Sequence, residues 1–464
     1  MSEVLRTTIA PAHNGAGAAL DLVPARAPAV APDVAPTTLM APDLAEAVAP
    51  GALACHAPSQ AGLDLAQAAS DLAPTVTASP SLAEIAAGAG LERIHIVAWR
   101  DLEDAEAGGS EVHASMVAEA WAAAGLDVVM RTSRAVGKPT ESVRDGYRVV
   151  RKSGRYGVFP RSMLSGLVGR AGPRDGLVEV WNGMPFLSPL WAHCPSIVFL
   201  HHVHAEMWRM VIKPPALARV GELIEYQLAP PLYRRSRIVT LSESSRDEIV
   251  SMLGLPKGNV TVVPPGVLAD FTPSGARSPH PLVVSVGRLV PVKRFDRLID
   301  TLVEVRRGQP TLEAVIVGEG TERRALEARI SAAGAGDWLL LPGRLDDAAL
   351  VGLYRKAWVL ASTSAREGWG MTITEAGACG TPAVASDIAG HRDAIEPGLS
   401  GLLAADARQL HADLARVLAD PALRARLGAG ALQRAQRLTW DATARGALVA
   451  LAEEASRRRS PRRW

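Results

Sequence analysis

Cysteine is scarce in this 464-residue chain, and long apolar runs are missing from it. The three cysteines, Cys55, Cys194 and Cys379, are too few and too scattered for a disulfide framework or a zinc site, which favours a reducing cytoplasm. No apolar run reaches about 18 residues, so we expect no membrane span. A cationic start followed by an apolar segment and a cleavage site is also missing, so no secretion signal is predicted.

Neither sign of charge dominates the chain. The formal net charge is +2, which by itself indicates no class of partner, and we expect no nucleic-acid partner. Residues 1–90 are net acidic, whereas the final segment, "RRRSPRRW" at 457–464, is strongly basic. This basic tail is either simply solvated or touches an anionic membrane, which would place a cytoplasmic protein peripherally at the inner face of the membrane.

Side chains that could build a core are rare in the first part of the chain. Residues 1–90 are nearly all Ala, Pro, Leu, Asp, Val and Thr, with prolines in the windows that would otherwise be helical. Such a segment buries too little apolar surface to offset the entropy lost on ordering. We therefore predict a disordered tail over residues 1–90.

Beyond the tail, strand and helix signals alternate. Short β-rich runs such as "IHIVAW" (94–99) and "SIVFLHH" (196–202) are separated by helical segments, which predicts parallel sheets with helices on both faces. The alternation pauses at a Gly/Pro/Ser-rich stretch, 266–281, and then resumes. We predict an α/β chain of two doubly wound domains, whose ligand lies in a cleft between them. The predicted segments after the tail are the domains 91–270 and 271–440, a terminal helix at 441–456 and the basic tail at 457–464.

Motifs for dinucleotide binding are incomplete. Gly108 and Gly109 precede a predicted helix with Ser110 as its N-cap, and they would let a ligand approach the backbone closely. The third glycine of a dinucleotide fingerprint is missing there, and it is also missing from "VIVGEGTERRAL" at 315–326. The sequence therefore disfavours a nicotinamide enzyme.

Three histidines follow a predicted strand. His201, His202 and His204 are not accompanied by His-Glu-x-x-His or Asp-x-Asp, so we expect no metal site. Metal ligation, hydrogen bonding within the protein and a role facing the substrate all stay open for them.

The segment "SAREGWGMTITEAGACGTPAVAS" (364–386) carries two glutamates around a Gly-Trp-Gly. Residues 368–371 would leave backbone N–H groups free beside a helix N-terminus, which favours an anion or a hydroxyl-rich ligand. Thr372 to Glu375 fits a capping box, so Glu375 is either a helix cap or a ligand-binding residue. Glu367 lies in the loop before the helix and has no such local role.

Two cations follow another buried strand, "VVSVGRLVPVKRFDRLI" (283–299). Arg288 lies at the carboxyl end of that strand and Lys293 at the start of the next helix. A diphosphate would lie there, held by the guanidinium fork and by the point charge of the ammonium group. The alternative is a pair of solvated surface cations.

In combination, "GRLVPVKRF", "REGWGMTITEAGACGTPAVASD", "AGHRDAI" and "GLSGLL" resemble the retaining glycosyltransferases of family 4, which have the GT-B architecture. The resemblance runs from about Ile94 to about Leu451. It implies two Rossmann-like domains facing a central cleft, no cofactor, and no metal ion. The implied reaction transfers a hexose from a nucleotide sugar, of the GDP-mannose or UDP-glucose type, to a hydroxyl of a saccharide, lipid or small-molecule acceptor with retained anomeric configuration.

The resemblance also implies roles for individual residues. Arg288 and Lys293 match the pair that neutralises the donor diphosphate, Glu367 matches the glutamate that holds the transferred sugar, and Glu375 matches the one that holds the ribose. His201 matches best the histidine that faces the sugar, with His204 as a rival. The implied catalytic residues are His201, Arg288, Lys293 and Glu367. The implied donor-binding residues are Gly108, Gly109, Arg288, Lys293, Glu367, Gly368, Trp369, Gly370, Met371, Thr372 and Glu375.

Two further functions stay open on the same fold. The first is a nucleotide-sugar-binding protein without transferase activity, and the second is a nucleotide-sugar epimerase that needs no acceptor. Donor hydrolysis would exclude the first function, and conversion of the donor into its epimer would indicate the second.

Overall fold

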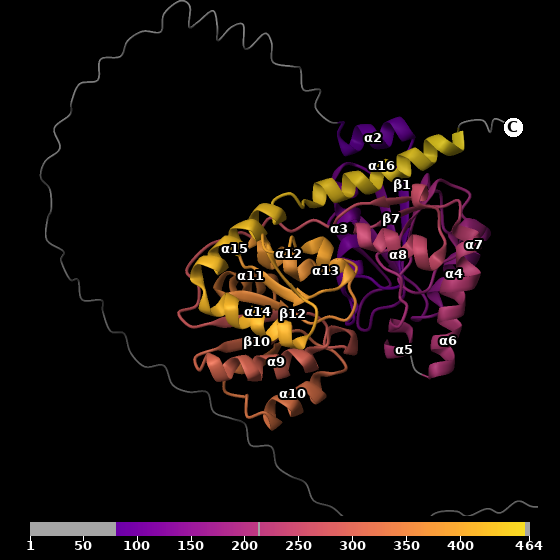
Figure 1. Ribbon diagram of the computed structural model, residues 1–464. Coiled ribbons are helices and arrows are strands. Elements are labelled where there is room, and N and C mark those ends of the chain that lie inside the picture. Colours follow the sequence, from indigo (N-terminus) through magenta and orange to yellow (C-terminus); the bar gives the residue numbers. More distant parts are fainter. Residues whose placement is uncertain (1–79, 212–213, 460–464) are drawn as a thin grey trace, which may run out of the picture. The chain divides into compact units, whose positions relative to one another are not determined.

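The computed structural model describes residues 80–211 and 214–459, which belong to one compact unit, Ala78–Trp464. Two sheets, each covered by helices, make up this part of the chain (Figure 1). The predicted α/β class with two mostly parallel sheets is confirmed. None of the described helices is long and apolar enough to cross a membrane.

The first sheet has eight strands in the order β3-β4-β2-β1-β5-β6-β7-β8, and only the β3–β4 pair is antiparallel. Its strands are β1 (Arg93–Val97), β2 (Asp127–Thr132), β3 (Glu141–Arg144), β4 (Tyr147–Arg151), β5 (Gly176–Val180), β6 (Ser196–Phe199), β7 (Arg237–Thr240) and β8 (Val260–Val262). Its helices are α3 (Gly109–Ala123), α4 (Val158–Leu167), α5 (Met207–Val211), α6 (Pro215–Leu223), α7 (Ala229–Tyr233) and α8 (Glu243–Leu253). The strands β5 and β6 are buried along their whole length, as expected for parallel strands covered on both faces.

The second sheet has six strands, all parallel, in the order β11-β10-β9-β12-β13-β14. Its strands are β9 (Leu282–Val286), β10 (Glu313–Val317), β11 (Leu339–Gly343), β12 (Val359–Ser362), β13 (Ala383–Ser386) and β14 (Gly401–Ala404). Its helices are α9 (Phe295–Gly308), α10 (Arg323–Ala332), α11 (Asp347–Lys356), α12 (Met371–Ala378), α13 (Ala389–Ala394), α14 (Ala407–Ala419) and α15 (Pro421–Ala435). The crossover from β9 at the centre to β10 on one side and β12 on the other is the switch point at which ligands of doubly wound sheets bind.

The prediction of a disordered tail over 1–90 is wrong for its last residues. Helix α2 (Leu82–Ala89) is closed at its start by a capping box, in which the Ser81 N–H donates to the Glu84 carboxylate at 2.7 Å. Leu82 and two alanines of the helix are buried, and Figure 1 shows α2 beside the C-terminal helix. The small apolar residues are therefore ordered by a partner helix that is distant in the sequence. The rest of the predicted tail, residues 1–79, lies outside the described residues.

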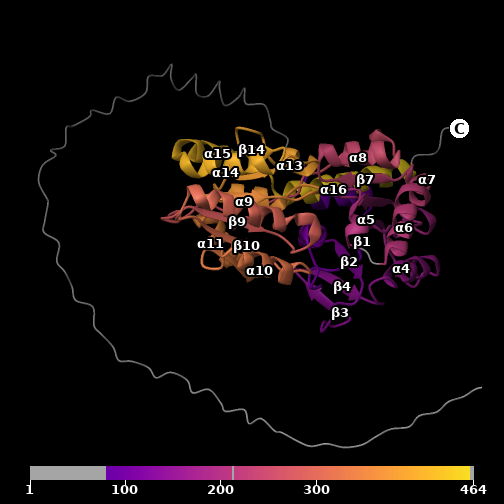
Figure 2. The same ribbon diagram turned by 60° about the horizontal axis from the view of Figure 1, so that its bottom comes forward.

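The last helix, α16 (Trp440–Arg459), follows the second sheet but packs on the first domain. Its residues Ala447, Leu448 and Leu451 are completely buried among side chains of that domain's core. The indole N–H of Trp121 in α3 also donates to the carbonyl of Ala444 in α16 at 3.0 Å. Figures 1 and 2 both show α16 running across the first domain. The helix is thus held by apolar burial and by a buried hydrogen bond.

The predicted boundary between the terminal helix and the basic tail at 457–464 is wrong by three residues, because residues 457–459 belong to α16 although their side chains are exposed. Arg457 and Arg458 both pair with the buried carboxylate of Glu454, at 2.7 and 2.8 Å, and the Arg459 guanidinium donates to the carbonyl of Ala89 in α2. A buried carboxylate needs partners of this kind, and it therefore orders the arginines. Residues 460–464 lie outside the described residues.

The chain crosses between the two domains at two adjacent points. Val267 in the connection after β8 pairs with Thr439, just before α16, in an isolated parallel bridge. A Cβ added at Gly266 would lie 2.2 Å from the backbone nitrogen of Trp440. Only glycine therefore allows the two crossing segments to lie this close together.

Candidate active site

Helix α3 of the first domain begins at the predicted glycine pair. Its N-cap is Gly108, whose N–H donates to the Glu111 carboxylate at 2.8 Å. The prediction of Ser110 as N-cap is therefore wrong, because the carboxylate three residues after Gly108 takes over the capping. The Ser110 hydroxyl lies within the first turn, where it donates to Glu111 and accepts from Asn182 Nδ2, both at 2.9 Å.

Helix α12 of the second domain has its N-cap two residues earlier than the predicted capping box. Its N-cap is Gly370 with φ of 104°, a conformation that glycine adopts without strain, and its first residue is Met371. The predicted capping box from Thr372 to Glu375 is thus wrong, since Thr372 lies inside the helix and Glu375 faces another partner.

The starts of these two helices face each other across the domains. A Cβ added at Gly109 would lie 3.2 Å from Met371 Sδ. The two helix N-termini, where N–H groups lack intrahelical acceptors and the dipoles have their positive ends, therefore lie close together. The region at these N-termini suits an anion.

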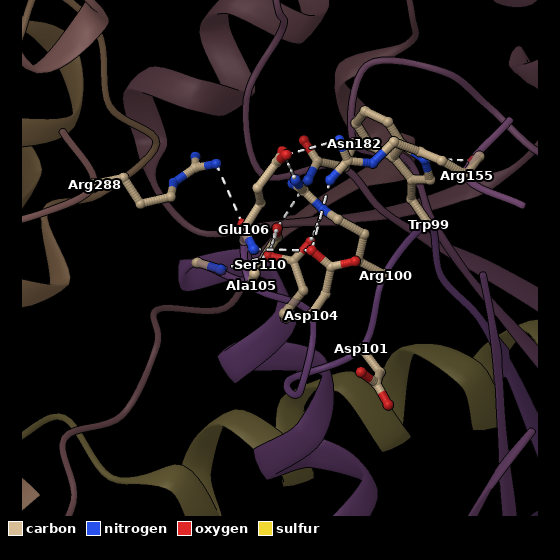
Figure 3. Close-up of polar contacts among 12 residues, drawn as sticks. Trp99, Arg100, Asp101, Asp104, Ala105, Glu106, Ser110, Arg155, Asn182 and Arg288 are labelled. Atoms are coloured by element: carbon tan, nitrogen blue, oxygen red, sulfur yellow. Dashed lines mark hydrogen bonds and ion pairs between the residues drawn. The ribbon is translucent and has the colours of Figure 1, made fainter. Parts of the chain in front are cut away.

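Arg288 reaches this region from the carboxyl end of β9. Its Nε would lie 3.2 Å from a Cβ added at Gly108, and its Nη1 donates to the carbonyl of Glu106 at 3.5 Å. Figure 3 shows the guanidinium directed toward the Glu106 segment. Among the described residues, no carboxylate lies within ion-pair distance of Arg288. Burial, together with the charge of Arg100, lowers the pKa of Arg288. An anion that binds here would meet a positive charge without a protein counter-ion.

Lys293 and Glu367 form an ion pair within the second domain. Lys293 ends the 3₁₀ turn Pro291–Lys293, and the Ser364 hydroxyl also donates to Glu367 at 2.7 Å. Burial acts against the charged form of Glu367, but Lys293 and the nearby His391 hold the pKa of Glu367 below its usual value. The carboxylate is therefore ionised at neutral pH and keeps Lys293 in place.

The loop that carries Glu367 is docked on the first domain. The carbonyl of Gly368 accepts hydrogen bonds from the hydroxyls of Ser242 and Ser245, at 3.1 and 3.3 Å. Arg366 donates from Nε to the carbonyl of Val203 at 3.0 Å and from Nη2 to Glu248 at 2.6 Å. These contacts join segments more than a hundred residues apart and have no local signal in the sequence, so they could not be predicted from it.

Glu375 of α12 is half-buried and lies against helix α11. It accepts a hydrogen bond from the Tyr354 hydroxyl at 3.1 Å. Burial raises the pKa of Glu375 to about 7, against an ordinary value of 4.5. A group that donates hydrogen bonds to this carboxylate would favour its charged form and lower that pKa again.

The three histidines that follow β6, namely His201, His202 and His204, point in different directions. His201 is buried and its Nε2 lies 3.2 Å from Nδ1 of His113 in α3, whereas its backbone oxygen lies 2.7 Å from a Cβ added at Gly368. The ring of His204 stacks on that of His202 at 5.2 Å. Burial lowers the pKa of His201 to about 4 and that of His204 to about 3, so both rings are neutral at pH 7.

His202 is the one of these three histidines whose ring nitrogen would contact a Cβ added at Gly368 in the glutamate loop. Its Nδ1 would lie 3.4 Å from a Cβ added at Gly368, and its buried Nε2 has no hydrogen-bond partner. The sequence alone could not predict which of the three histidine rings faces the second domain, because they are nearly adjacent in the chain. Trp369 in the same loop is buried, and its Nε1 has no hydrogen-bond partner either.

A charged cluster of the first domain lies behind Arg288 (Figure 3). The buried Arg100 pairs with Glu106 at 3.2 Å and with Glu111 at 3.3 Å, while Arg155 pairs with Glu106 at 2.8 Å. This cluster holds the loop before α3, and hence the Glu106 carbonyl that receives Arg288. No group of histidines, cysteines or carboxylates in the described part of the chain could hold a metal ion.

Comparison with known proteins agrees with this geometry. The family model "Glycosyltransferase Family 4" matches residues 107–271, and the model "Glycosyl transferases group 1" matches residues 269–434. A D-inositol 3-phosphate glycosyltransferase of Jonesia denitrificans is 30% identical over 389 residues, which cover 73% of this chain and 89% of that relative. The enzyme of the same name from Frankia alni is 33% identical over 234 residues, covering 46% of this chain and only 58% of the relative.

Solved structures of low identity share the fold. Sucrose-phosphate synthase of Thermosynechococcus elongatus has a TM-score of 0.66 at 21% identity, covering 76% of this chain and 96% of that one. Anabaena HepE in complex with UDP-glucose has a TM-score of 0.59 at 17% identity, covering 79% and 98%. With both family models matched in sequence order along two parallel-sheet domains, the chain belongs to glycosyltransferase family 4 and has the GT-B fold.

Proposed function

We propose that this chain transfers a hexose, mannose or glucose, from a nucleotide sugar to an acceptor hydroxyl, with retained anomeric configuration and without a metal ion or other cofactor. The observation that carries the proposal is the place of Arg288. This guanidinium has no carboxylate partner among the described residues and reaches the paired starts of α3 and α12. A donor diphosphate would supply the missing negative charge.

Lys293 would supply the second positive charge. Its ammonium group pairs with Glu367, so a donor phosphate would share that group with the carboxylate. Two cations and two helix N-termini can stabilise the charge that develops on the leaving diphosphate, which is the part that a metal ion performs in other transferases. The proposal of metal independence rests on these groups.

Glu367 would position the sugar and would not attack it. Its carboxylate is held by Lys293 and by Ser364, which leaves it suited to accept hydrogen bonds from sugar hydroxyls. For retention, a leaving phosphate oxygen would accept the proton of the acceptor on the same face of the sugar, while Arg288 and Lys293 stabilise that oxygen. Glu375 would accept hydrogen bonds from the ribose hydroxyls.

The first donor and acceptor to test follow from the related proteins. HepE was crystallised with UDP-glucose, and the curated relatives are named for D-inositol 3-phosphate. We therefore place UDP-glucose first among donors, with GDP-mannose as the second, and inositol 3-phosphate first among acceptors. Saccharide and lipid acceptors complete the panel.

The experiment measures product formation from each donor in EDTA, with the anomeric configuration read by NMR. We expect turnover with one donor, a product of the same configuration as the donor, and a loss of about a hundredfold or more in Arg288→Ala. The matched control is Arg426→Ala, an exposed arginine of α15 without a partner among the described residues. A need for added divalent ions, an inverted product, or a donor epimer formed without acceptor would each refute the proposal.

A further inference from the structure

The first domain also contains a cavity that lies apart from the candidate active-site residues. It has a volume of about 740 Å³ and lies between strands β1, β2 and β4 and helix α4. None of the predicted donor-site residues lines it. The volume is in the range of cavities that hold small organic ligands.

The charged residues that line the cavity are all cationic. Five charged side chains line the cavity, all of them positive, and no aspartate or glutamate is among the lining residues. The five are Arg131, Lys152, Arg161, Arg170 and Arg174. Of these, only Lys152 has a carboxylate partner among the described residues, Glu141 at 2.9 Å.

Two of the arginines keep part of their hydrogen-bonding capacity unused. The Nε atoms of Arg131 and Arg174 are buried and have no hydrogen-bond partner. Burial, followed by the charges of Arg174 and Arg148, lowers the pKa of Arg131, which shows that its positive charge is held at a cost. Phosphate oxygens can accept hydrogen bonds from such unused N–H groups, because they fit the planar fork of a guanidinium group.

The remaining lining provides hydroxyl groups, an apolar wall and an opening. Ser162 and Ser165 of α4 line the cavity with their hydroxyl-bearing side chains, and Val97 and Trp191 belong to its apolar wall. Leu164 also lines the cavity although 57% of its surface is exposed, so the cavity opens to solvent along α4. A ligand could therefore enter without unfolding of the helix.

The segment between β4 and α4, part of which lines the cavity, also contacts the candidate active site. Arg155 lies in the segment between β4 and α4, and it pairs with Glu106, whose carbonyl receives Arg288. The Trp99 indole N–H donates to the carbonyl of Arg155 at 2.7 Å (Figure 3). The Trp99 ring also packs on the ring of Phe159 in α4. The two regions are therefore neighbours that use different residues.

We propose that this cavity is a second anion site, which binds a ligand carrying at least two negative charges on phosphate groups. Five cations without an acidic neighbour inside the lining, two unused guanidinium Nε atoms and an opening along α4 carry the assignment. The phosphate groups belong either to a free organic phosphate or to a lipid headgroup. The site is independent of the donor diphosphate, which would lie at Arg288.

The test is hydrogen exchange of the full chain by mass spectrometry, with inorganic pyrophosphate as the probe. We expect pyrophosphate to slow exchange in Val158–Leu167, with a half-saturation concentration raised at least about tenfold in the double variant Arg161→Gln, Arg170→Gln. Both side chains are exposed and without partners in the described part of the chain, so the variant should keep the fold. The matched control is Arg408→Gln, Arg426→Gln, the same change of charge at exposed positions of the second domain.

The remaining arms separate the sources and the two sites. Slower exchange of α4 with vesicles of cardiolipin and phosphatidylcholine, but not with pyrophosphate, would assign the site to a lipid headgroup, provided that the double variant abolishes it and pure phosphatidylcholine has no effect. Arg288→Ala should keep the protection of α4, whatever it does to the donor. Equal protection in the wild type and in the double variant, or no protection by either probe, would overturn the proposal.

Discussion

The binding of the donor should depend on pH through Glu375. Burial raises the pKa of this carboxyl to about 7, and ribose hydroxyls would donate to its ionised form. If only that form binds well, the affinity of the nucleotide for the wild type should fall about tenfold between pH 8 and pH 6, because the ionised fraction falls by that factor. The substitution Glu375→Gln keeps an oxygen that can accept from the Tyr354 hydroxyl, but it cannot titrate.

The assay is isothermal titration with UDP or the best donor at pH 6, 7 and 8, for the wild type and for Glu375→Gln. Titration of the nucleotide phosphate affects both proteins equally, so the difference between their pH slopes reports the glutamate. We expect the variant to bind more weakly at pH 8 and to lose this part of the slope. Equal slopes in the two proteins would refute the place of Glu375 at the ribose.

Glu375 should also affect stability, with the opposite dependence on pH. Because its folded-state pKa of about 7 lies above the ordinary 4.5, the folded protein keeps a proton that the unfolded chain releases between these values. The free energy of unfolding should therefore fall as pH rises from about 4.5 to 7, by up to about 3 kcal/mol in total. Urea unfolding at pH 5 and pH 7 should show about 2 kcal/mol of this loss in the wild type and none of it in Glu375→Gln; an equal loss in both would contradict the raised pKa.

Substitutions at two glycines should affect activity and stability differently. Gly108→Ala places a Cβ 3.2 Å from Nε of the neighbouring arginine, so we expect that side chain to shift by a few tenths of an ångström and kcat/KM to fall about tenfold. The midpoint of unfolding should change little; Gly352→Ala, where a Cβ meets nothing within 4 Å, is the control, and unchanged kinetics would contradict the role of the guanidinium. Gly266→Ala places its Cβ 2.2 Å from the backbone nitrogen of Trp440, so we expect a loss of about 3 kcal/mol or more in unfolding free energy, measured by urea denaturation. The control Gly258→Ala meets nothing within 4 Å, and equal stability of the two variants would contradict the close crossing of the domains.

The class of fold could be predicted because each strand signal is local. The run Leu282–Val286 is apolar apart from Ser285, as in parallel strands buried on both faces, and the turn-rich stretch 266–281 separates the two sheets. Helix α2 could not be predicted in this way, since its alanines are ordered by α16, which lies more than 350 residues further along the chain. The composition of a segment indicates the entropy that the segment loses on ordering. It gives no information on a helix far along the chain that can pack against the segment.

The candidate site was predicted where residue type and strand end coincide, as for Arg288 and Lys293. Its helix starts were misplaced because two caps were possible within three residues: a carboxylate at position 111 competes with the hydroxyl of Ser110, and Gly370 begins α12 before Thr372. The contacts of the glutamate loop with Ser242 and Ser245 depend on how the two domains meet, which no single motif encodes.

The most direct test of the central claim is calorimetric binding of a nucleoside diphosphate, UDP first and GDP second, to the wild type and to Arg288→Ala in EDTA. The account predicts metal-free binding to the wild type, with an affinity at least about tenfold lower in the variant because the uncompensated guanidinium is its main anchor. Binding that requires a divalent ion, or equal affinity in both proteins, would contradict the claim that protein cations hold the donor diphosphate.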